Sequence, residues 1–69
     1  MQLSTRNQLP GTIKDIKTDS VMAQVVVELD QGGEMVSVIT ADSAQRLNLT
    51  VGKKVMVMVK ATDVSVASE

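Results

Sequence analysis

The feature that most constrains this fold is the alternation of apolar and other residues in two segments, 21–29 and 53–61. Successive side chains of a β-strand point to opposite faces, so such alternation predicts strands buried on one face. Val, Ile and Thr, which favour strands, supply 21 of the 69 residues. The alternate apolar residues are Ala23, Val25, Val27 and Leu29 in the first segment, and Val55, Val57 and Val59 in the second.

Turn-forming residues divide the rest of the chain into short elements. We expect strands at residues 9–17, 21–29, 34–40, 53–61 and 62–67, and a short helix at 43–47 that opens on Ser43 and ends at Asn48. Residues 18–20 form a turn, and residues 30–33 form a hairpin loop in which Gly32 and Gly33 allow positive φ. Five strands with one helix after the third predict an all-β, OB-like Greek-key barrel. The alternative is an open antiparallel sheet with the helix over one end.

Size and apolar surface together predict self-association. The 69 residues make one domain, whose core seldom supplies more than about 3–5 kcal/mol, and without cysteine there is no disulfide to reinforce it. Met56 and Met58 point away from the valine face of their strand, and a similar outward position is expected for four other apolar residues. These are Met22, Val26, Met35 and Ile39.

Composition argues against several classes of function. Without His or Cys there is no imidazole base and no ordinary zinc site, and no motif supports a Ser–Lys dyad, so we expect no enzyme. A net charge of −1 and a complete lack of aromatic residues argue against a nucleic-acid partner. No apolar run approaches the ~18 residues of a membrane span, and we expect a cytoplasmic protein.

The remaining polar residues are suited to binding an anion. Residues 4–8 carry an unbroken run of hydrogen-bonding side chains, including the Arg6 guanidinium. Lys60 adds a second cation, and Ser43 offers a hydroxyl at the start of the expected helix. These groups form a set of donors that suits a small dianion, although residue types alone favour the simpler interpretation of a polar tail and a solvated lysine.

Two motifs near the ends of the chain resemble those of a known family. Ser-Thr-Arg-Asn-Gln-Leu-Pro-Gly at residues 4–11 is similar to the Ser-Ala-Arg-Asn-Gln-Leu-x-Gly signature of the molbindins, the single-Mop-domain molybdate- and tungstate-binding proteins. Val-Lys-Ala-Thr-Asp-Val at residues 59–64 matches a second motif at the family's spacing. The resemblance extends over essentially the whole chain, so residues 1–69 are expected to form one Mop domain.

This resemblance implies an assembly and a ligand. Molbindins form homohexamers, arranged as trimers of dimers, that hold molybdate or tungstate between subunits by hydrogen bonds alone. The ligand is an intact oxyanion, with no cofactor and no direct protein ligand to the metal, and the implied role is intracellular molybdenum storage and homeostasis. The matching positions are Ser4, Thr5, Arg6, Ser43, Lys60 and Ala61, with Asn7 and Thr62 as secondary candidates.

Two details of the implied site are particular to this chain. Thr5 stands where the family usually has Ala, and both Thr5 and Ala61 are expected to act through their backbone N–H groups. A second site near the threefold axis is placed at the turn of residues 19–22. Two other functions stay open at this point: a structural or regulatory oligomerisation module without physiological anion binding, and a nucleic-acid-binding OB domain.

Overall fold

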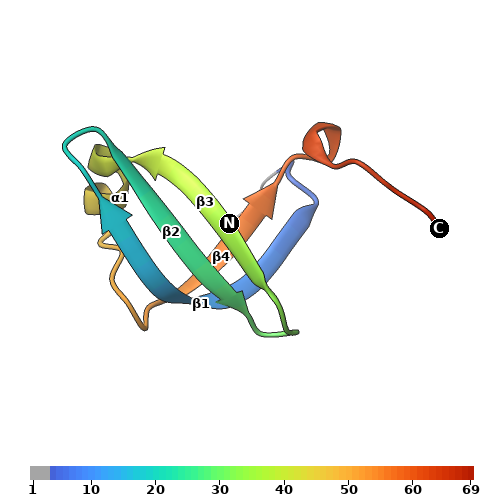
Figure 1. Cartoon of the computed structure of the whole chain (residues 1–69), viewed down its shortest axis with the longest axis horizontal. Helices are drawn as coiled ribbons and strands as arrows, with labels where there is room; N and C mark the ends of the chain where they lie inside the picture. The colour runs from blue at the N-terminus through green and yellow to red at the C-terminus, as the bar shows by residue number, and fades with distance from the viewer. Residues whose placement is uncertain (1–3) are drawn as a thin grey trace.

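The computed structural model describes residues 4–69 as a curled antiparallel sheet with one short helix (Figure 1). The four strands are arranged in the order β3-β2-β1-β4, and every neighbouring pair is antiparallel. The mostly-β class with one helix is therefore confirmed, and no helix among residues 4–69 is long and apolar enough to cross a membrane. The elements are β1 (Asn7–Thr18), β2 (Met22–Leu29), β3 (Glu34–Thr40), α1 (Ala41–Arg46), β4 (Lys54–Val59) and the 3₁₀ turn η1 (Ala61–Asp63).

The long strand β1 gives the sheet its curl. Residues from Asn7 to Thr12 pair with β4, whereas residues from Gly11 onward pair with β2. The two ends of β1 therefore pair with different strands. A β-bulge between Ile13 and Asp15 shifts the register with β2, and bulges bend a strand and increase its twist. As a result, β4 and the β2–β3 hairpin lie along different halves of one bent strand.

The core lies on the concave side of the curl and contains the predicted face of β2. Ala23, Val25, Val27 and Leu29 are all buried, together with Ile13 from β1. Val55 and Val57 of β4 pack against them, as the alternation predicted.

The predicted outward positions of Met35 and Ile39 are wrong. Met35 pairs with Val27 and Ile39 pairs with Ala23, and partners in a ladder share one face, so both side chains pack against the core. Val36 and Val38 occupy the outer face of β3 instead. Met22, Met56 and Met58 are exposed as predicted.

The turns follow the residue types that predicted them. Gly32 and Gly33 have φ of 105° and 86° in the β2–β3 hairpin, where a side chain would be strained. Asn48, expected to end the helix, has φ of 54°, a left-handed conformation common just after a helix C-terminus.

The helix begins earlier than predicted. Its N-cap is Thr40, whose Oγ1 accepts a hydrogen bond of 3.1 Å from the Ser43 N–H, so Ser43 lies inside the first turn and does not cap it. Thr40 and Ser43 both carry a hydroxyl that can cap a helix. The pairing of β3 with β2 ends at Thr40, so the helix begins directly after Thr40 and this residue is the cap.

The predicted fifth strand at residues 62–67 is wrong for the single chain. Residues 61–63 form η1, and residues 64–69 belong to no strand. Figure 1 shows this C-terminal segment running away from the sheet. An extended segment becomes a strand only where a neighbour accepts its hydrogen bonds, and this segment has no neighbouring strand within residues 4–69.

Candidate functional site

The two motifs of the chain ends meet because β1 begins where β4 ends. Asn7, the first residue of β1, pairs with Val59, the last residue of β4, and the Asn7 side-chain amide donates to the Val59 carbonyl at 3.1 Å. Antiparallel pairing at this point brings the residues before β1 next to the residues after β4. The Gln8 side chain holds the incoming segment by donating to the Thr5 carbonyl at 2.8 Å.

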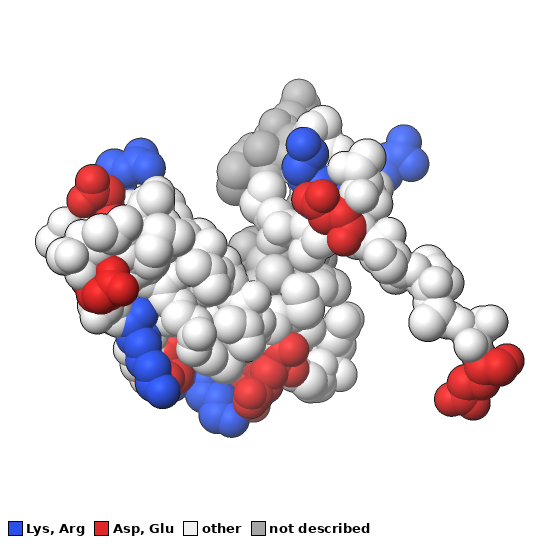
Figure 2. Space-filling view, turned by 45° about the horizontal axis from the view of Figure 1, so that its top comes forward, with Lys and Arg blue, Asp and Glu red and all other residues white. Residues whose placement is uncertain are grey.

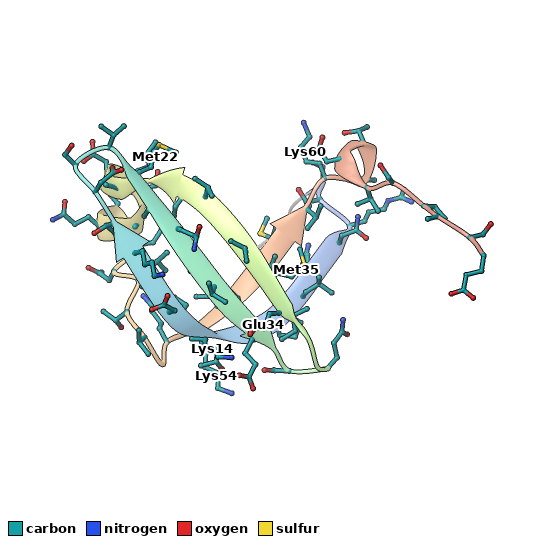
Figure 3. The ribbon with its side chains drawn as sticks, viewed as in Figure 1. Lys14, Met22, Glu34, Met35, Lys54 and Lys60 are labelled. Carbon is teal, nitrogen blue, oxygen red and sulfur yellow. The ribbon has the colours of Figure 1, made fainter. Side chains whose placement is uncertain are left out.

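These flanking residues enclose a small surface hollow of about 170 Å³. Its lining comes half from the segment before β1 and half from the segment after β4. Figure 3 shows Lys60 at the junction of β4 and η1, at the end of the sheet opposite Met22. The lining residues are Ser4, Thr5, Arg6, Lys60, Ala61 and Thr62.

The hollow is rich in hydrogen-bond donors. Arg6 and Lys60 carry positive charge, while Ser4, Thr5 and Thr62 carry hydroxyl groups. The backbone bonds of η1 use the N–H groups of Asp63 (2.9 Å to Lys60 O) and Val64 (3.2 Å to Ala61 O). Ala61 and Thr62 precede them in this turn, and both residues line the hollow.

The cations of the hollow are accessible to an incoming anion. Arg6 and Lys60 are both exposed, and the ion pair found within residues 4–69 lies elsewhere, between Lys14 and Glu34 at 2.9 Å. Figure 2 shows blue side chains around the base of the C-terminal segment, with red ones next to them. Asp63 in η1 is an acidic residue next to this lining.

The two secondary candidates have different positions. Thr62 lines the hollow with the main candidates. Asn7 instead uses its side-chain amide to join β1 to β4. The presence of Asn7 in the first motif is therefore explained by its role in pairing β1 with β4, which brings the two sides of the hollow together.

Ser43 is not in the lining of the hollow. It belongs to α1, which lies at the far end of the sheet from η1 (Figure 1). Its hydroxyl accepts hydrogen bonds from Thr40 at 2.8 Å and from the Arg46 guanidinium at 3.2 Å. A role for Ser43 in the same site therefore needs a second copy of the chain and stays a prediction.

The turn at residues 19–22 already contains an anion of its own. The N–H groups of Val21 and Met22 each donate to Asp19 Oδ1 at 2.7 Å. The bond from the Met22 N–H, followed by that from Val21, lowers the pKa of the Asp19 carboxyl below its usual value. An oxyanion at this turn would compete with the carboxylate, and the predicted second site here stays a prediction.

The carboxylates of the described part of the chain do not gather into a metal site. No group of three His, Cys, Asp or Glu residues within 4–69 is placed to hold a metal ion.

Comparison with known proteins identifies the family. Residues 3–66 match the model of the TOBE domain. The chain belongs to the TOBE domain family. One relative, "Molybdenum-pterin-binding protein 2" of Clostridium pasteurianum, is 38% identical over 96% of this chain and 97% of its own length. The resemblance to molbindins is confirmed by this relationship.

Solved structures of related proteins agree with the fold. A molybdate-binding protein from Sporomusa ovata superposes with a TM-score of 0.93 and 43% identity, covering 99% of this chain and all of its own. The cytoplasmic molybdate-binding protein ModG, solved with molybdate bound, superposes with a TM-score of 0.83 and 38% sequence identity. The match covers 88% of this chain and 43% of the ModG chain.

Proposed function

We propose that this TOBE-domain protein binds molybdate as an intact oxyanion in the hollow between its two end motifs. The observation that carries the proposal is the composition of that lining, in which Arg6 and Lys60 meet from opposite ends of the chain. Hydrogen bonds from charged donors to an anion are about twice as strong as neutral ones. The molybdate-binding relatives support the choice of anion.

The open shape of the hollow supports a site shared between subunits. Arg6 and Lys60 are exposed in the single chain, where water weakens their attraction for an anion. A second subunit over the hollow would exclude this water, and Ser43 of that subunit could then add its hydroxyl. We place the site at subunit interfaces of a homohexamer built as a trimer of dimers.

The donor-only lining also bears on selectivity. A fully deprotonated dianion accepts hydrogen bonds from every direction, whereas monoprotonated phosphate brings an O–H that needs an acceptor. Leaving that O–H unpaired in a buried site costs about 1–3 kcal/mol. Sulfate is smaller than molybdate and would lie too far from some donors of a rigid pocket. Tungstate shares the shape and charge of molybdate and fits the same proposal.

The cellular role that follows is storage and buffering of molybdenum in the cytoplasm. A site built from hydrogen bonds releases its anion unchanged, which suits a reservoir and requires no catalytic group or cofactor. The relative ModG is described as cytoplasmic, in keeping with this location.

Calorimetric titration of the purified protein with molybdate tests the proposal. Arg6→Ala and Lys60→Ala should each weaken binding by about ten- to a hundred-fold, because hydrogen bonds to charged groups contribute about 1.5–3 kcal/mol. Lys54→Ala is the matched control, since Lys54 is an exposed lysine at the other end of β4 and outside the hollow. The oligomeric state of each variant is measured in parallel.

Three results would contradict the proposal. Unchanged affinity in both Arg6→Ala and Lys60→Ala would place the anion elsewhere. Displacement of molybdate by a comparable concentration of sulfate or phosphate would make the hollow a general anion site. A protein that assembles normally but binds no molybdate would point to the structural oligomerisation module.

A further inference from the structure

The side chains of α1 and its cap form a small hydrogen-bond network around one hydroxyl group. Ser43 Oγ accepts a hydrogen bond of 2.8 Å from the Thr40 hydroxyl and one of 3.2 Å from the Arg46 guanidinium. Thr40 and Arg46 each lie three residues from Ser43, and residues at this spacing are neighbours on a helix surface. The network is therefore local and forms in the single chain.

This network uses both acceptor positions of the Ser43 oxygen. A hydroxyl group has two lone pairs and one O–H, so it can accept two hydrogen bonds and donate one. With both lone pairs occupied, the Ser43 hydroxyl can only donate. Its O–H donates to no group among residues 4–69, so it is available to a ligand.

The two donors are directed toward Ser43 by the local structure. Thr40 Oγ1 accepts the helix-capping bond of 3.1 Å from the Ser43 N–H, which holds the Thr40 hydroxyl beside Ser43 Oγ. Asp42 lies four residues before Arg46, a spacing at which opposite charges often pair on a helix. The ion pair within residues 4–69 is instead the one between Lys14 and Glu34, so Arg46 donates to Ser43 and not to Asp42.

We propose that Arg46 is a positioning residue that makes Ser43 selective for fully deprotonated oxyanions. This inference rests on the proposed function, in which Ser43 of one subunit faces the hollow of another. At that place the Ser43 O–H donates to the anion, as Arg6 and Lys60 do. Hydrogenphosphate brings an O–H of its own, and the Ser43 oxygen has no lone pair left to accept it.

Without Arg46, the same serine would accommodate either kind of anion. One lone pair of Ser43 Oγ would be vacant, and a serine hydroxyl rotates to donate or to accept as its partner requires. A hydrogenphosphate O–H could then donate to Ser43 while its other oxygens accept from Arg6 and Lys60. Arg46 thus excludes phosphate through the hydrogen-bonding state of Ser43, whatever the size of the hollow.

Competition among three anions measures this effect in the full-length protein. Molybdate is titrated by calorimetry at neutral pH, alone and in the presence of phosphate or sulfate. Arg46→Ala should reduce the preference for molybdate over phosphate by about five-fold or more, because an unpaired O–H in a buried site costs at least about that factor. The preference for molybdate over sulfate should stay unchanged, since neither of these anions carries a proton at neutral pH.

Two further variants separate the hydrogen bond from the charge of Arg46. Lys17→Ala is the matched control, because it removes an exposed cation from β1 at the end of the sheet that carries α1 (Figure 1). Lys17→Ala should leave both preferences unchanged. Arg46→Lys keeps a charged donor three residues after Ser43 and should restore most of the preference for molybdate over phosphate.

A double-mutant cycle determines whether Arg46 acts through Ser43. Ser43→Ala should weaken molybdate binding by about two- to ten-fold, the effect of one ordinary hydrogen bond. In the Ser43→Ala background, Arg46→Ala should cause no further change in the preference for molybdate over phosphate. Circular dichroism and the oligomeric state of every variant are measured in parallel.

Three results would overturn this inference and leave molybdate binding in the hollow intact. Unchanged molybdate affinity in Ser43→Ala would show that Ser43 does not reach the anion. Equal effects of Arg46→Ala and Lys17→Ala would show that only the charge matters. A change caused by Arg46→Ala that persists in the Ser43→Ala background would show that Arg46 acts without Ser43. Failure of the unmodified protein to bind molybdate would instead overturn the proposed function, and this inference with it.

Discussion

Replacing Gly11 by alanine should separate β1 from β2. Gly11 is buried and pairs with Leu29 on one side and Val55 on the other. A Cβ at this position would lie 2.6 Å from both the Glu28 carbonyl oxygen and Val27 Cγ1, where ordinary contacts are 3.4–4 Å. The valine methyl can rotate away, but the carbonyl oxygen belongs to the neighbouring strand and moves only with it.

The expected cost of Gly11→Ala is about 3 kcal/mol, the upper part of the ~1–3 kcal/mol range for overpacked cores. That upper value applies because one of the two shortest contacts is to backbone. A domain of this size has only about 3–5 kcal/mol of core stability, so most of the free energy of unfolding should be lost. Gly52→Ala is the control: its φ of +93° strains an alanine, but nothing lies within 4 Å of the new Cβ. Strain alone costs about 1–2 kcal/mol.

The assay is urea unfolding followed by far-ultraviolet circular dichroism, because the chain has no aromatic residue to report by fluorescence. All variants are compared at one protein concentration, since association adds to the apparent stability. The reasoning would be refuted if Gly11→Ala were no more destabilising than Gly52→Ala. That result would mean that β1 and β2 adjust to a methyl group without loss of pairing.

Two further predictions concern charged groups. Asp63→Asn should tighten molybdate binding a few-fold at low ionic strength and less at high salt, because it removes a negative charge next to the hollow; equal affinities in calorimetry would count against it. The Asp19 carboxyl has a pKa lowered by the N–H groups of Met22 and Val21, so its stabilising effect is present above its ordinary pKa of 3.8 and is lost as the pH falls below that value. The melting temperature of the unmodified protein should therefore fall between pH 7 and pH 2, and it should fall less in Asp19→Asn. Parallel profiles of melting temperature against pH for the two proteins would disprove the prediction.

Much of the local structure could be predicted from the sequence. The alternation of Val25, Val27 and Leu29 identified the buried face of β2, because side-chain direction in a strand depends only on position along the chain. Gly33 marked a position of positive φ, and Asn48 marked the end of the helix, for similarly local reasons. The residues of the hollow were also suggested by sequence, but through resemblance to a family and not through their chemistry alone.

The register of β3 could not be predicted in the same way. Residues 34–40 carry apolar side chains on both faces, Met35 and Ile39 on one and Val36 and Val38 on the other. Periodicity cannot choose between two apolar faces, and a shift of one residue exchanges them. Pairing of Met35 with Val27 across the hairpin made the choice, through the Asp30–Gly33 turn that sets the register.

The sequence by itself thus determined the places of β1, β2, β3 and β4, where the chain turns and which face of β2 is buried, since these depend on neighbours along the chain. Only the tertiary structure decided that Arg6 and Lys60 share one hollow, that Thr40 and not Ser43 caps α1, and that the last residues leave the sheet. Each of these outcomes depends on where a strand pairs and where its pairing stops. Pairing joins residues far apart in the chain, so no local pattern contains it.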